Sequence, residues 1–235
     1  DSLNYFMEFE ADKISVQPAT ALVLHDSLSN KEIPLVYGEY FVNFQEQLVN
    51  CRLECPLVFA GFGITAPEFK YDDYANVDVK DKIVVVLDGE PLSDDDNYFY
   101  GAIPSGYSSA LFYKRHRAKE LGAKGIIVLS YPKLLAKWDD FIGYFKANKM
   151  VFAGDVVIPA DSERIPFVFG NDKLFTEILS HGPYSYDSIR ALVREKKELP
   201  VFQIRHLSAR LNIDLKFTKT KAMNVVGMIE GKDVK

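Results

Sequence analysis

A short apolar run, Ile83 to Leu87, constrains the fold of this chain more than any other stretch. Asp81-Lys82 precede the run, Asp88-Gly89 follow it, and β-branched residues fill most of it. An apolar run of this length between turn formers favours a strand buried on both faces over a turn of helix. We therefore expect the stretch from Pro56 to Gly89 to be the scaffold on which the rest of the chain packs.

The first half of this scaffold predicts a strand, a corner and a structured loop. Leu57 to Phe59 continue an apolar pattern into the corner Gly61-Phe62-Gly63. The loop Tyr71-Asp72-Asp73-Tyr74 follows, and we expect its aromatic rings to pack inward while both acids face water.

A helix and a second apolar strand follow the scaffold. The helix is expected from Ser108 to Leu121, with Ser108 or Ser109 as its N-cap, a basic face opposite its apolar one, and Gly122 as its stop. The apolar strand from Gly125 to Ser130 comes directly afterwards. Strand, helix and strand predict a βαβ unit with parallel strands.

The remaining elements are mainly strands. We expect them within residues 1–10, 21–24, 33–49, 165–170, 201–204, 211–217 and 222–231. Helices are expected over residues 133–149, from a cap at Asn171 through Leu179, and from Asp187 to about Lys197. The predicted fold class is mixed α/β, with a β-rich core and flanking helices. At 235 residues, this is one large domain or one domain with flanking pieces.

Charge and hydropathy exclude two classes of partner. A net charge of −5 with scattered basic residues argues against nucleic acid, because phosphate binding needs a basic face. No apolar run approaches the roughly 20 residues that a membrane-spanning helix needs. The chain begins at Asp1 without a signal-peptide pattern, so we interpret it as a mature or trimmed segment.

The histidines and cysteines predict no metal site. His25, His116, His181 and His206 each stand alone in sequence, outside any H-E-x-x-H motif. Cys51 and Cys55 are too few for structural zinc. In an extended chain their Cα atoms would lie about 13 Å apart, so a disulfide requires a sharp turn between them. Whether they are bridged is left open.

Other catalytic or ligand motifs are only approximate. Ser108 stands in a sequence that resembles a G-x-S-x-G elbow but does not follow a buried strand directly, so we interpret Ser108 as a helix cap. The adjacent acids Asp94-Asp95-Asp96 lack the alternation of a calcium loop. Gly61-Phe62-Gly63 lacks the third glycine and the following helix of a phosphate-binding loop. We therefore assign no catalytic, cofactor-binding or metal-binding residue.

Aromatic side chains give the one candidate partner surface, which consists of Tyr98, Tyr100, Tyr107 and Trp138. Trp138 lies on the apolar face of the helix predicted over residues 133–149. Core packing is the simpler interpretation of that face, and a lid or partner surface is the alternative, because the helix belongs to a long insertion.

Several motifs together resemble a known family. They are Gly61 to Ile64, Tyr71 to Tyr74, Asn76 to Pro91, Lys114 to Ser130, and Ile165-Pro166 with Val168. This pattern, from Leu57 to about Phe169, is similar to the protease-associated (PA) domain of secreted zinc aminopeptidases of the M28 type. Asn224-Val225-Val226-Gly227 resembles the segment that leads into the catalytic domain of those enzymes.

The resemblance implies a swivelling β/β/α fold, an exported parent enzyme with two zinc ions, and a PA region that shapes substrate access or binds partners. The family's zinc ligands lie beyond the matched segment, so none is carried onto this chain. The implied division is N-terminal strands over residues 1–50, a PA-like domain over 51–200, and a segment over 201–235 that leads into a catalytic domain. The implied partners are a peptide or protein substrate, or the chain's own catalytic domain. The alternative function is a free-standing secreted interaction or ligand-binding module.

Overall fold

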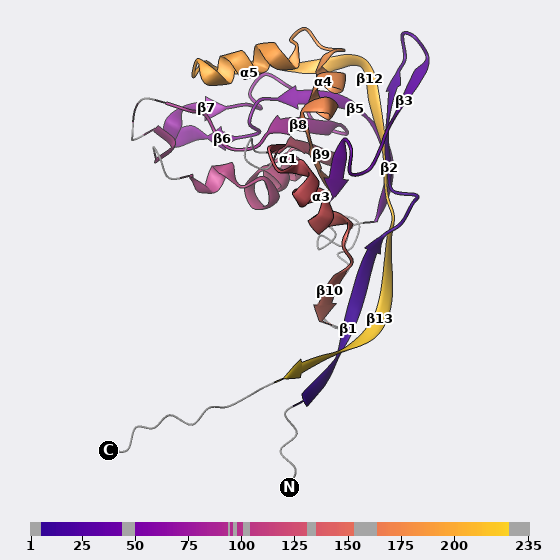
Figure 1. Cartoon of the computed structure of the whole chain (residues 1–235). Coiled ribbons are helices and arrows are strands. Elements are labelled where there is room, and N and C mark those ends of the chain that lie inside the picture. The colour runs from indigo at the N-terminus through magenta and orange to yellow at the C-terminus, as the bar shows by residue number, and fades with distance from the viewer. Residues whose placement is uncertain are drawn as a thin grey trace, which may run out of the picture.

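The computed structural model describes residues 6–43, 50–93, 95, 98–100, 104–130, 135–152 and 164–225. These residues form an α/β body and a narrow sheet that extends away from it (Figure 1). The predicted mixed α/β class, with a β-rich core and flanking helices, is confirmed.

The body is built on a sheet of eight described strands in the order β3-β2-β12-β5-β8-β9-β11-β4. Their bounds are β2 Ala21–Asp26, β3 Lys31–Leu35, β4 Phe41–Asn43, β5 Cys51–Ala60, β8 Ile83–Leu87, β9 Gly125–Leu129, β11 Phe167–Gly170 and β12 Val201–Ile213. The central pairs β5–β8, β8–β9 and β9–β11 are parallel, and the outer pairs are antiparallel. A small hairpin of β6 (Thr65–Ala66) and β7 (Tyr71–Asp72) follows β5.

Strand β8 has the bounds predicted from its apolar run, and all five of its side chains are buried. Because side chains alternate along a strand, Ile83, Val85 and Leu87 join one core cluster while Val84 and Val86 join another. Burial on both faces is what the sequence predicted.

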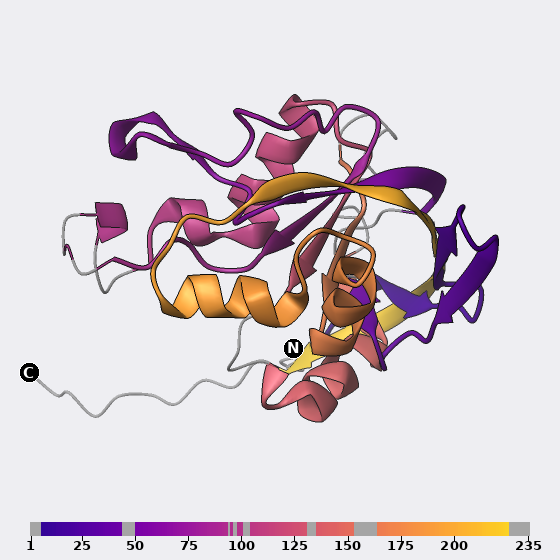
Figure 2. The same ribbon diagram turned by 90° about the horizontal axis from the view of Figure 1, so that it is seen from above.

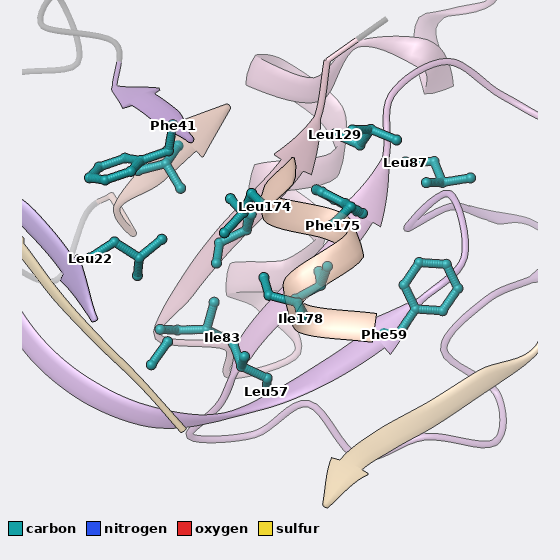
Figure 3. Close-up of a cluster of buried hydrophobic side chains, with 14 of the residues drawn as sticks. Leu22, Phe41, Leu57, Phe59, Ile83, Leu87, Leu129, Leu174, Phe175 and Ile178 are labelled. Carbon is teal, nitrogen blue, oxygen red and sulfur yellow. The ribbon is translucent and has the colours of Figure 1, made fainter. Parts of the chain in front are cut away.

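Helices cover both faces of the sheet (Figure 2). Helices α4 (Asp172–Leu179) and α5 (Tyr186–Arg194) pack on the face of Ile83, and α1 (Arg115–Glu120) and α3 (Trp138–Lys146) pack on the face of Val84. Figure 3 shows the first cluster, where Phe175 and Ile178 of α4 lie against the side chains of the sheet.

The βαβ unit is confirmed by the parallel pairing of β8 with β9. Its helix is more irregular than predicted, because a 3-10 turn η4 (Gly106–Ser108) and a π-helix η5 (Ala110–Lys114) precede α1. Gly122 ends the helix in a left-handed conformation at φ 87°, as expected for a C-terminal stop.

Several predicted boundaries were wrong. The helix predicted over residues 133–149 ends at Lys146, and Lys149 begins strand β10 (Lys149–Phe152). Asn171 caps α4 as predicted, whereas α5 begins one residue before Asp187, with Ser185 as its cap. The strands expected at 201–204 and 211–217 are divided differently, because β12 continues through a bulge and β13 begins at Leu215.

The narrow sheet consists of β10, β1 (Phe6–Val16) and β13 (Leu215–Val225), with β1 in the middle. We call these three strands the ribbon. All its pairings are antiparallel, and Phe6 lies opposite Val225 at the end farthest from the body (Figure 1). The predicted strand over residues 222–231 lies partly outside the described residues. The division of the chain into three parts stays a prediction.

Candidate functional site

The corner Gly61-Phe62-Gly63 is held from inside by a buried carboxylate. Asp73 accepts hydrogen bonds from the backbone N–H groups of Phe62 at 3.0 Å and Ile64 at 3.1 Å, and from the hydroxyl of Tyr71 at 2.7 Å. The prediction that both acids of this loop face water was wrong for Asp73, because its carboxylate satisfies backbone donors that the corner would otherwise bury unpaired.

A second buried ion lies beside the corner. Lys114 is fully buried, and its Nζ donates to the carbonyl oxygens of Leu87 at 2.7 Å and Gly89 at 2.5 Å. The ammonium also lies 5.7 Å from the ring centroid of Phe62. Helical spacing places Lys114 on the apolar face of this helix rather than on its predicted basic face, and there its ammonium satisfies the carbonyl groups at the end of β8.

Burial favours the neutral form of both Asp73 and Lys114. Loss of solvation raises the pKa of Asp73 to about 6, against the lowering effect of its hydrogen bonds and of Lys114. Loss of solvation lowers the pKa of Lys114 to about 8, against the raising effect of Asp88, Asp73 and Glu90. Both groups are mainly charged near neutral pH. Since neither is exposed to a substrate, the pair fixes the corner and supplies no reactive group.

Two of the predicted partner residues meet in one aromatic cluster around the buried Phe99. Its ring centroid lies 4.9 Å from that of Tyr98 and 6.0 Å from that of Tyr107. The Tyr107 hydroxyl donates to Glu68 at 2.6 Å. Both tyrosines are half-buried at the edge of this cluster. The side chain of Tyr100 lies outside the described part of the structure.

Trp138 lies apart from those tyrosines and lines a groove of about 580 Å³. The groove runs between α3 and the start of α4, with Tyr37, Ile142 and Lys146 among its lining residues. The indole N–H donates to the carbonyl oxygen of Gly38 at 2.9 Å, and the ring packs against the core cluster below α3. Trp138 is therefore both a packing residue and one wall of an open groove.

The ribbon carries exposed apolar side chains on both faces. Met7, Met150 and Phe152 share one face with Phe9, whose ring centroid lies 4.8 Å from that of Phe152. Met223 lies opposite Glu8 on the other face. These three methionines and Phe152 are between 53% and 57% exposed, which is unusual for several large apolar residues of one small sheet.

The serine and histidine candidates have structural surroundings. Of the two N-caps predicted for the helix of the βαβ unit, Ser109 is confirmed and Ser108 is not a cap. Its hydroxyl donates to the carbonyl oxygen of Ser105 at 2.7 Å, while Ser105 and Ser109 cap the helical turns. His116 lies 3.2 Å from Glu120 on the exposed surface. His25, His181 and His206 lie around a bulge at residues 205–207 of β12.

The cysteines and the acids give no metal centre. Cys51 and Cys55 are free thiols on the extended strand β5, and burial raises the pKa of Cys51 to about 11. Across the described ranges, no group of three or more His, Cys, Asp or Glu residues is arranged to hold a metal ion. The described residues thus do not fit the zinc ions of the resembling family. Asp94 and Asp96 lie outside the described residues.

Sequence reasoning missed Asp73, Lys114 and the apolar ribbon. Helical spacing places Lys114 on the apolar face, three residues after Leu111 and four before Ala118, but its charge argued against burial. No residue near Asp73 in sequence indicates the backbone groups that bind it. The alternation of Met7 and Phe9 with Glu8 and Glu10 was the available signal for an apolar face on β1.

Comparison with known proteins gives matches at the level of structure alone. No family model and no curated protein match the chain. An aminopeptidase from Aneurinibacillus sp. strain AM-1 is similar at 14% identity over 93% of this chain and 36% of that one, with a TM-score of 0.43. A zinc aminopeptidase from Bacillus subtilis is similar at 16% identity over 98% of this chain and 38% of that one, with a TM-score of 0.36.

A psychrophilic subtilisin-like protease from Pseudoalteromonas sp. AS-11 is similar at 14% identity over 89% of this chain and 35% of that one, with a TM-score of 0.25. The solved structures that resemble the chain thus include zinc aminopeptidases, and it spans little more than a third of their length. At these identities and TM-scores, the likeness carries no argument about the site or the activity. No helix in the described part of the chain is long and apolar enough to cross a membrane.

Proposed function

We propose that this chain is the non-catalytic, PA-like region of an exported zinc aminopeptidase of the M28 type. In this role it packs against the catalytic domain of the same protein and shapes the access of peptide substrates. The zinc ions and their ligands belong to that catalytic domain. The motif resemblance from Leu57 to about Phe169 supports the family, and the export of the parent enzyme follows from the same resemblance.

The ribbon is the observation that carries this proposal. An apolar patch on a projecting sheet is costly in water, since each buried methylene is worth about 0.8 kcal/mol. Met7, Met150 and Phe152 are more than half exposed on one face. A second protein surface that covers them recovers this free energy, which is the behaviour expected of an accessory region that docks on an enzyme.

Substitution of Phe152 tests the docking. In the proposed complex, Phe152→Ser weakens binding to the separately expressed catalytic domain about tenfold or more, because one buried aromatic anchor is lost. Phe112→Ser is the matched control, since Phe112 is 81% exposed on the π-helix η5 in the body. Isothermal titration calorimetry measures both variants. Equal affinity of the two variants, or no complex with the unsubstituted chain, contradicts the proposal.

A second candidate function is a free-standing secreted module that binds peptides in the groove beside Trp138. Its supporting observation is the groove of about 580 Å³ with an aromatic wall. Trp138 is the sole tryptophan of the sequence, so its fluorescence reports on this groove directly. A saturable change in emission on titration with trileucine favours the second candidate, and an unchanged spectrum favours the first.

A further inference from the structure

A wide bulge interrupts the pairing of β12 with β5. Ile204 lies opposite Leu57 and Ser208 lies opposite Pro56, so Arg205, His206 and Leu207 have no partner residue on β5. Bulges often occur where a sheet redirects side chains toward a binding site. This bulge replaces three positions of regular pairing in the middle of the longest strand of the body.

The bulge is held in one conformation by contacts on its inner side. His206 has a φ of 63°, a left-handed conformation that costs a residue with a side chain about 1 kcal/mol. Its carbonyl oxygen accepts hydrogen bonds from the backbone N–H of Ser27 at 2.8 Å and from the Ser27 hydroxyl at 3.2 Å. Leu207 is 2% exposed and anchors the bulge in the core. Arg205 and His206 are consequently presented to solvent.

Two cavities meet at this point. A cavity of about 390 Å³ is lined by His25, His206 and Ser208 among others, and a cavity of about 480 Å³ is lined by His181, Pro183 and Phe202. Gln203 and Arg205 line both. We call the two cavities together the bulge groove.

Arg205 is a cation without a counter-ion in the described part of the chain. Arg210, five residues later on the same strand, forms ion pairs with Glu32 at 2.9 Å and Glu54 at 3.1 Å, whereas Arg205 forms none there. The nearby Asp26 already accepts hydrogen bonds from the backbone of Leu28 and the hydroxyl of Ser29.

The rest of the groove offers further donors and an apolar wall. The Nε2 atom of His181 lies 4.0 Å from Oε1 of Glu177. His25 and His206 form no ion pair with any of the described residues. Phe202 is supported from behind, because its ring centroid lies 5.3 Å from that of Phe59 and 5.7 Å from that of Tyr184. The groove therefore combines an unpaired guanidinium with a rigid aromatic surface.

We propose that the bulge groove binds a carboxylate carried beside an apolar side chain, with Arg205 as the anchor and Phe202 as the apolar contact. A guanidinium binds a carboxylate through two parallel hydrogen bonds, which fixes orientation as well as charge. A peptide carboxyl terminus that ends in an apolar residue has this chemistry. The site is independent of the proposed role beside a catalytic domain.

N-acetyl-L-phenylalanine is the probe, and its carboxamide is the matched neutral compound. NMR titration of the full chain is expected to show saturable shifts at residues 202–206 in the millimolar range with the acid and none with the amide. Arg205→Gln weakens binding about tenfold or more. Arg210→Gln makes the same charge change on the same strand outside the groove and leaves the affinity unchanged.

Three outcomes overturn the site. They are equal binding of the acid and the amide, equal loss of affinity in both arginine variants, and the absence of saturable shifts with the unsubstituted chain. Arg205 is exposed, so its substitution leaves the fold intact, and the NMR spectrum of each variant without probe checks this directly.

Discussion

Asp73 is a buried carboxylate whose burial the sequence did not predict. Its partners are the backbone N–H groups of Phe62 and Ile64 and the hydroxyl of Tyr71. The loop containing it was predictable from its aromatic and turn-forming residues. The inward direction of Asp73 was not, because it depends on donors that only the folded corner brings together. The burial of Lys114 could not be predicted for the same reason, since its acceptors are two carbonyl groups at the end of another element.

The raised pKa of Asp73 gives stability a defined pH dependence. Its pKa rises from 3.8 to about 6 on folding, so the folded state binds more protons between these values. This contribution to the free energy of unfolding is full below the unfolded pKa of 3.8 and is lost as the pH rises through 6. The difference between the unsubstituted chain and Asp73→Asn should therefore change by about 2 kcal/mol between pH 4 and pH 7.

Urea denaturation across this pH range measures the difference. Asp72→Asn is the matched control, because the neighbouring Asp72 is exposed. Its difference from the unsubstituted chain should stay nearly constant. A constant difference for Asp73→Asn as well would show that Asp73 keeps its unfolded pKa in the fold.

At the scale of elements, local sequence signals predicted the presence of strands and helix caps better than they predicted where each strand or helix ends. The apolar run of β8 and the cap Asn171 of α4 carry their own signals and were both predicted to the residue. The end of α3 and the division of β12 from β13 were wrong. Pairing of β10 with β1 and pairing of β13 with β1 set those boundaries, and both involve segments distant in sequence.

The corner between β5 and β6 gives a prediction at this scale. Gly63 has a φ of 69°, and a Cβ there would lie 2.8 Å from Val86 Cγ1 and 3.0 Å from Tyr74 Oη. Gly89 has a similar φ of 80° but would meet nothing within 4 Å. Gly89→Ala should cost about 1 kcal/mol from backbone strain alone. Gly63→Ala should cost a further 1–3 kcal/mol, roughly, from overpacking.

Thermal or chemical denaturation of the two glycine variants separates strain from packing. Since both positions require a left-handed conformation, the difference between them isolates the clash with β8. Equal destabilisation would mean that the corner relaxes away from Val86 without cost.

For the whole molecule, the resemblance predicted the fold class, and the ribbon was predicted only as separate strands. The body supplies a sheet with helices on both faces, a corner fixed by buried ions, and two open grooves. The ribbon projects from the body (Figure 1) and adds exposed apolar side chains, among them Met7, Met150, Phe152 and Met223. The proposed accessory role follows from this combination, with the reaction carried out by a separate catalytic domain.

Hydrolysis of leucine p-nitroanilide by the purified chain tests this account most directly. The assay is run with added zinc, with a chelator, and with the separately expressed catalytic domain. We predict no release of p-nitroaniline above the buffer rate by the chain alone, with or without zinc, and a changed KM of the catalytic domain when the chain is added. Zinc-dependent turnover by the chain alone that the chelator removes would contradict the account.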